Sequence, residues 1–155
     1  MNIFVLDKEP TMAAQYQCDK HVVKMILESA QLLCSIWPDG EAPYKRTHYN
    51  HPCAIWTRTS RSNYDWLLLH SYALLHEYQK RYGKIHKSKE VIDFCSKSVH
   101  SFTSNVGTEW PQCMPDQYKM SNDVVQAYRN YYIGEKMKFA KWKLGNTPYW
   151  WPKTT

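Results

Sequence analysis

The chain has 155 residues, of which 43% are apolar, and a formal net charge of +6. A chain of this length can bury one sizeable core, so we expect a single helical domain over residues 1–155. No run approaches the roughly 20 apolar residues that cross a bilayer, and no basic segment leads into an apolar one near residue 1, which excludes a membrane protein and a signal peptide and favours a cytoplasmic location.

The positive charge is concentrated at the end of the chain. From Tyr118 onward seven lysines and arginines face two acids, so +5 of the total +6 lies in this last quarter. Clustered cations favour a polyanionic partner, here DNA or a nucleotide. The 12 Tyr, 7 Trp and 4 Phe either fill the core or stack on bases. The five cysteines are scattered without a CxxC pair, so we expect no disulfide framework, metal or other cofactor.

A short apolar segment, Ile3–Leu6, opens the chain as either a strand or an arm packed on the body. The first helix is predicted from Pro10 to about Trp37, where Pro38-Asp39-Gly40 ends it.

One narrow face of this first helix carries reactive groups. His21, Lys24 and Glu28 are spaced by three and four residues, which aligns an imidazole, an amine and a carboxylate. This set can perform acid–base or imine chemistry, or it can be a solvated polar stripe.

A polar loop follows, and Asn50-His51-Pro52 is typical of a cap before a short helix through Trp56. His48 and His51, with Cys53 near, superficially resemble metal ligands, but an HxxH pair in a loop without an acidic partner is a weak signal. We therefore expect hydrogen bonding, with His51 capping the helix or orienting a phosphate.

The central helix is predicted from Ser62 to Tyr82 and is apolar around most of its circumference. It carries one aligned polar stripe, which is either an internal network or a site wall: Asn63, His70, Glu77 and Arg81. The segment Arg81–Lys89, with His86 and Lys87, is a basic turn that is either solvated or a phosphate clamp.

The last helix is predicted from Asn122 to about Trp142, after a weaker helix over Ser88–Phe102 and a loop over Thr103–Ser121. One face of the last helix is aromatic and includes Tyr128, Tyr132 and Trp142. A basic line beside it consists of Arg129, Lys136 and Lys143. Rings beside cations suit stacked bases with phosphates alongside, although a regular aromatic stripe also suits a core.

Five segments carry a resemblance to known proteins: CDKHVVKMILE (Cys18–Glu28), THYNHPCAIW (Thr47–Trp56), NYDWL (Asn63–Leu67), EYQKRYGKIHKS (Glu77–Ser88) and AYRNYYIGEK (Ala127–Lys136). Over nearly the whole chain they resemble a family of small bacteriophage proteins. More distantly, the layout is similar to the pyrimidine-dimer DNA glycosylase (endonuclease V) family. That resemblance implies an all-α, compact, single-domain fold with a short N-terminal arm, which binds duplex DNA and flips a nucleotide out.

The resemblance also implies attack on the sugar by an N-terminal α-amine, assisted by a carboxylate of the first helix. Asn2 is bulky enough that we expect Met1 to be retained and to supply the amine. The family's glutamate falls on the valines of HVVK, and the nearest acids are Asp19 and Glu28. The catalytic candidates are therefore Met1, Asp19, His21, Lys24 and Glu28. As a class, α-amines have lower pKa values than lysine amines, about 7.7–8.0 against about 10.4.

Two functions remain open. The first is a DNA glycosylase/AP lyase acting through an imine, with the Met1 amine or Lys24 as the nucleophile and Asp19, His21 or Glu28 as the acid–base group. The second is a non-enzymatic protein that sequesters a nucleotide or a nucleotide-derived immune signal. Both use the same predicted phosphate-binding residues: Lys20, His48, Asn50, His51, Arg81, His86, Lys87, Arg129, Lys136 and Lys143.

Overall fold

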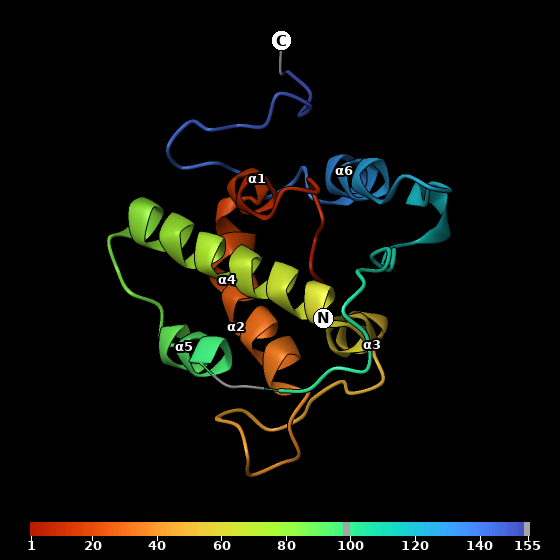
Figure 1. Ribbon diagram of the computed structural model, residues 1–155. Coiled ribbons are helices and arrows are strands. Elements are labelled where there is room, and N and C mark those ends of the chain that lie inside the picture. The colour runs from red at the N-terminus through yellow and green to blue at the C-terminus, as the bar shows by residue number, and fades with distance from the viewer. Residues whose placement is uncertain (98–99, 154–155) are drawn as a thin grey trace.

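A computed structural model describes residues 1–97 and 100–153 (Figure 1). These residues form six α-helices, one 3-10 helix and no strand, so the prediction of a compact all-α fold is confirmed. The elements are α1 (Pro10–Tyr16), α2 (Asp19–Cys34), α3 (Pro52–Thr59), α4 (Arg61–Tyr82), α5 (Lys89–Lys97), η1 (Asp116–Tyr118) and α6 (Val124–Glu135). None of the described helices is both long and apolar enough to cross a membrane.

The first predicted helix is in fact two helices. Gln17 and Cys18 have extended backbone, with ψ angles of 136° and 164°, and separate α1 from α2. The cause is the Gln17 side chain, which is buried and donates from Nε2 to the Ile3 carbonyl at 3.1 Å. This break lets α1 and α2 pack at different angles on α4 (Figure 1).

The long helix α4 is the centre of the fold, as its apolar composition predicts. It contacts α1, α2, α3 and α5, and Figure 1 shows it crossing the middle of the molecule. It begins at the Ser60 cap, whose side chain accepts the Asn63 N–H. It ends at Gly83, which has a φ of 67°, a left-handed conformation that favours glycine.

The N-terminal segment is an arm and not a strand. Ile3–Leu6 is buried, and Figure 1 shows the arm rising from beside α3 to the start of α1. Phe4 has a φ of 58°, so the chain bends inside the core rather than extending along a partner.

The last helix is shorter than predicted. Asp123 caps α6 by accepting the Gln126 N–H at 3.0 Å, and the helix ends at Glu135, seven residues before Trp142. The described residues 136–153 contain turns, bends and irregular chain but no helix, so Arg129, Lys136 and Lys143 do not form a line along one helix, and that prediction is wrong.

The aromatic face of α6 belongs to the core. Tyr128 and Tyr132 are 0% exposed and Trp142 is 8% exposed. The tyrosine rings pack against Phe4 of the arm, with ring centroids 6.1 and 5.7 Å away, and Trp142 packs against Trp151 of the tail. Neither tyrosine ring has a free face on which a base could stack, so the prediction of a stacking surface is wrong for Tyr128 and Tyr132. Trp142 lies beyond the end of α6 and lines a pocket on the tail.

Residues 103–121 are irregular, as predicted, except for η1. Of the helix predicted over Ser88–Phe102, the structure shows α5 over Lys89–Lys97. Residues 98–99 lie outside the described part of the chain, and residues 100–102 are not helical.

Candidate functional site

A pocket of about 390 Å³ lies where the N-terminal arm meets α2 and the end of α6. Its walls include four of the predicted catalytic residues: Met1, His21, Lys24 and Glu28. Two predicted phosphate-binding residues, His51 and Lys136, also line it. A larger pocket of about 640 Å³ lies on the C-terminal tail, but its lining contains no carboxylate or imidazole. The smaller pocket therefore has the chemistry of a reactive site.

The α-amine of Met1 and the carboxylate of Glu28 form the centre of this pocket. The two groups are 3.2 Å apart, measured from the amine nitrogen to Glu28 Oε1. Lys24 Nζ lies 3.7 Å from Glu28 Oε2, but the lysine side chain is 70% exposed, whereas that of Glu28 is 11% exposed. Only the α-amine is thus held inside, next to a shielded carboxylate that can exchange a proton with it.

Asn2 holds the arm in place. Its Oδ1 accepts the Ile3 N–H at 2.8 Å, and its Nδ2 donates to the Cys113 carbonyl at 2.9 Å. Its own backbone N–H donates to Glu28 Oε1 at 3.2 Å. These contacts fix the position of residue 1 relative to α2.

His21 lies in the wall of the pocket as a neutral imidazole. Burial, together with the positive charges of Lys136 and Lys24, lowers the pKa of His21 to about 3. Its Nδ1 is 2.6 Å from the Tyr132 hydroxyl, and its ring stacks on Phe4 with centroids 4.3 Å apart. At neutral pH His21 can therefore orient a ligand by hydrogen bonding, but it carries no charge.

Asp19 lies outside this pocket. Its Oδ1 accepts from Arg81 Nη1 and from the Lys143 backbone N–H, both at 3.1 Å. The prediction of Asp19 as a catalytic group therefore has no support from the geometry. Although the sequence resemblance placed the family's glutamate on Val22 and Val23, the structure places the carboxylate of Glu28 beside the amine.

Arg81 is a structural residue and not a phosphate clamp. It is 4% exposed, and its guanidinium donates to Glu77, to Asp19 and to the carbonyls of Gln15 and Gln17. All five N–H groups of its guanidinium donate to acceptors within the protein, so none is left for a phosphate, and the prediction that it binds phosphate is wrong. The polar stripe on α4 is accordingly the internal network, since Asn63, His70 and Glu77 are also buried.

Arg129 is likewise committed within the protein. Its guanidinium donates to the Leu6 carbonyl at 3.0 Å, to Asp7 at 3.4 Å and to the Tyr149 hydroxyl at 3.1 Å. The side chain is 12% exposed, so the geometry gives no support to its predicted role on a phosphate backbone.

The other predicted phosphate-binding residues lie in two kinds of place. His51 and His86 accept backbone N–H groups at Cys53 and Ser88 and thereby begin local turns. The remaining side chains are exposed and belong to Lys20, His48, Asn50, Lys87 and Lys143. Lys136 lines the pocket with its amine over the ring of Phe4. The Lys20 amine lies over the ring of Phe139, which packs against the ring of His21 in the pocket wall at 5.7 Å between centroids.

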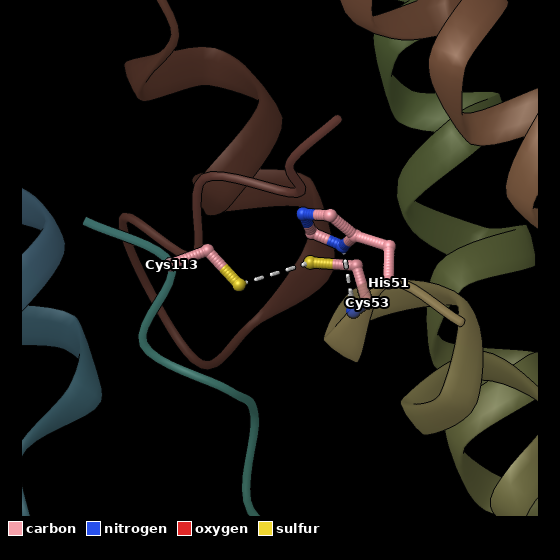
Figure 2. A group of neighbouring side chains, drawn as sticks. All are labelled: His51, Cys53 and Cys113. Atoms are coloured by element: carbon pink, nitrogen blue, oxygen red, sulfur yellow. Dashed lines mark hydrogen bonds between the residues drawn. The ribbon is translucent and has the colours of Figure 1, made fainter. Parts of the chain in front are cut away.

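Sequence reasoning noted Cys53 but missed its pairing with Cys113 beside the pocket. Figure 2 shows Cys53, from the first turn of α3, facing Cys113 from the irregular segment before η1, with their sulfurs 3.6 Å apart. The hydrogen bond from the Cys53 thiol lowers the pKa of Cys113 to about 7. No spacing rule could pair them, because 60 residues separate them in the chain.

Comparison with known proteins identifies a family. A family model described as pyrimidine dimer DNA glycosylase matches residues 1–91, more than half of the chain. The matched segment contains the arm, α2 with its reactive face, and the whole of α3 and α4. No curated protein and no solved structure matches the chain.

Proposed function

Because the chain belongs to the pyrimidine dimer DNA glycosylase family, we propose that it is a DNA glycosylase/AP lyase that acts through an imine at the Met1 α-amine. The observation that carries the proposal is the 3.2 Å contact between this amine and Glu28 Oε1 inside a pocket. An amine nucleophile needs a nearby base to remove its protons, and the contact supplies one.

The reaction follows from these two groups. The amine, after passing a proton to Glu28, attacks C1′ of the deoxyribose while the C1′–base bond breaks and the base leaves with a proton. After loss of a second N–H proton, the nitrogen lone pair forms the C1′=N bond while the C1′–O4′ bond breaks, so the sugar ring opens and O4′ takes up a proton to become a hydroxyl. Removal of a proton from C2′ then allows the C3′–O bond to break, which releases the 3′ phosphate end. Glu28 is suited to each proton transfer because it lies beside the nitrogen throughout.

The size of the pocket supports a single flipped nucleotide as the substrate. At about 390 Å³ it is in the range of sites for small molecules and is too small for a duplex. An enzyme that works on a base must take that base out of the stack, which costs a few kcal/mol. Lys24 and Lys136 at this pocket, with Lys20 near it, are suited to hold the phosphates on either side of the extruded nucleotide.

Borohydride trapping tests the proposal, because reduction of the imine links protein and DNA permanently. We expect wild-type protein to be trapped on duplexes that contain an abasic site or a pyrimidine dimer. Glu28→Gln should slow trapping at least about 100-fold, as expected for the loss of a general base. Extending the N-terminus by one non-cleavable residue should abolish trapping, whereas Lys24→Ala should only weaken it.

The matched control is Glu90→Gln, which changes an exposed glutamate on α5 and should leave trapping unchanged. Trapping that survives the extension and disappears in Lys24→Ala would transfer the role to the lysine. Failure of the folded wild-type protein to trap on either duplex would overturn the proposal.

The tail pocket favours a second candidate function, which is sequestration of a free nucleotide. This pocket of about 640 Å³ combines the indoles of Trp142 and Trp151 with Lys141 and Lys153, which suits a base beside a phosphate. Calorimetry with free nucleotides distinguishes the two functions. Tight binding without turnover, lost in Trp151→Ala, would support sequestration, and no detectable binding would exclude it.

A further inference from the structure

We propose that His51, Cys53 and Cys113 form a zinc-binding site in the wall of the candidate active-site pocket (Figure 2). Their ligand atoms all lie within 4.8 Å of one another. The inference concerns residues that the imine mechanism does not use, so it stands independently of the proposed function.

The distance between the sulfurs matches a shared metal ion. Two thiolates bound to tetrahedral zinc at about 2.3 Å each lie about 3.8 Å apart. Cys53 Sγ and Cys113 Sγ are 3.6 Å apart, close to that tetrahedral edge. A disulfide requires about 2.05 Å, so forming one would need a much larger movement of the two side chains.

The kind of donors identifies the cation. Thiolates and imidazole are soft or intermediate ligands, which select zinc over magnesium or calcium. Two thiolates also cancel the double charge of the ion. A loaded site is therefore neutral overall and does not repel the Met1 ammonium that lines the same pocket.

The position of the three residues indicates what the ion would do. His51 and Cys53 begin α3, whereas Cys113 lies in the irregular segment that precedes η1. The Cys113 carbonyl accepts from Asn2 Nδ2 at 2.9 Å, and its N–H donates to the Tyr128 hydroxyl at 3.2 Å. An ion at this point would connect α3 and α6 to the arm that positions the α-amine.

Ligation has an identifiable cost. His51 Nδ1 now accepts the Cys53 N–H at 3.0 Å, as Figure 2 shows, and a neutral imidazole that binds metal through either nitrogen gives up this bond. One helix-cap hydrogen bond is a small loss beside three metal–ligand bonds. Three protein ligands leave a fourth tetrahedral position, and since His51 and Cys113 line the pocket, water or an atom of a bound ligand can fill it.

A second cysteine pair provides a matched control. Cys34 and Cys95 are both buried with sulfurs 3.8 Å apart, but within the described chain no histidine or carboxylate joins them as a third ligand. If closeness of two thiols were enough to hold an ion, both pairs would bind one. The proposal predicts metal only at the pair that includes His51.

The experiment uses the reduced full chain titrated with Co²⁺ and then with Zn²⁺. We expect one equivalent to bind, measured by native mass spectrometry, with a near-ultraviolet thiolate-to-cobalt charge-transfer band that Zn²⁺ removes. Cys113→Ser should abolish the band, His51→Gln should weaken binding at least about tenfold, and Cys34→Ser should retain one equivalent.

Absence of the charge-transfer band in folded wild-type protein would overturn the proposal, as would a band that persists in Cys113→Ser. The reduced protein could also bind no ion but lose two hydrogens when it is oxidised. If Cys113→Ser does not show this loss, Cys53 and Cys113 form a thiol–disulfide pair and the zinc proposal is wrong. The test uses Cys113→Ser because Cys113 is only partly buried, so this variant is expected to fold even if Cys53→Ser, at a buried position, does not.

Discussion

At the scale of single residues, burial determines what each polar group can do. His70 in α4 is fully buried, with Nδ1 donating to the Pro10 carbonyl at 3.0 Å and Nε2 accepting from Gln17 at 3.2 Å. Both nitrogens of its neutral ring are thus used, and protonation would break the bond from Gln17. Burial lowers the pKa of His70 to about 4, just as it helps to lower that of His21 to about 3.

These two histidines make the stability of the protein sensitive to acid. Their native pKa values lie below the unfolded value of about 6.5, so between those limits the unfolded chain binds protons that the native protein refuses. The stabilisation is complete above about pH 6.5 and is lost as the pH falls towards 4 and 3. We expect the free energy of unfolding, measured in urea, to drop by about 2 kcal/mol per histidine between pH 7 and pH 5.

His70→Gln should roughly halve this dependence on pH, and the exposed His48→Gln should leave it unchanged. Equal stability of the wild-type protein at pH 5 and pH 7 would show that neither imidazole is held neutral.

At the scale of helices, side-chain contacts at the helix ends connect one helix to the next. Arg81, in the last turn of α4, binds the carbonyls of Gln15 and Gln17 at the end of α1 and Asp19 at the start of α2. One guanidinium therefore bonds the free carbonyls at the break between α1 and α2 and also forms an ion pair with the Glu77 carboxylate.

Replacing Arg81 should disrupt that junction. Arg81→Met leaves the buried Glu77 carboxylate without its cation, so we expect a loss of about 3–5 kcal/mol in the free energy of unfolding. Arg81→Lys should rescue little of it, because an ammonium cannot reach the same fork of acceptors. Urea denaturation provides the measurement, with the exposed neighbour Lys80→Ala expected to change stability by less than about 0.5 kcal/mol. A loss below about 1 kcal/mol in Arg81→Met would contradict this role.

The break between α1 and α2 also shows which parts of the fold could be predicted from the sequence and which could not. The central helix and its stop at Gly83 follow from apolar composition and a glycine, and the face with His21, Lys24 and Glu28 follows from spacing along one helix. The break at Gln17 does not, because it depends on burial of a polar side chain by residues far along the chain.

The same limit applies to the candidate site. The periodicity of the sequence predicted that the last helix continues past Glu135 to about Trp142. Because the helix ends at Glu135, Trp142 and Lys143 do not lie on a face of it. The pairing of Cys53 with Cys113, and of Met1 with Glu28, arises from contacts between distant segments that no local pattern records.

At the scale of the whole molecule, lysines from three segments lie near the N-terminal half of α2. The Lys20 amine lies over Phe139 and the Lys136 amine over Phe4, while the Lys143 backbone N–H binds Asp19. Lysines from α2, from the end of α6 and from the tail therefore lie around this half of α2, of which His21 and Lys24 line the candidate active site, and this suits a phosphate backbone that crosses here.

Salt-dependent DNA binding checks this arrangement. Lys20→Ala, Lys136→Ala and Lys143→Ala should each reduce the slope of log affinity against log salt by about one, whatever the DNA sequence. Lys97→Ala, on α5 at a distance from α6 in Figure 1, is the control and should leave the slope unchanged. If none of the three lysine variants alters the slope, the phosphate backbone follows another face.

Two groups of indole rings give the molecule separate optical reporters. Trp56, Trp66 and Trp110 lie within 6.1 Å of one another on the body, between ring centroids, and Trp150 and Trp151 are 6.1 Å apart on the tail. Their fluorescence and near-ultraviolet dichroism therefore report on two regions of the same chain. A tail that separates before the helices melt would show two optical transitions without any added dye, and a tail that unfolds with them would show one.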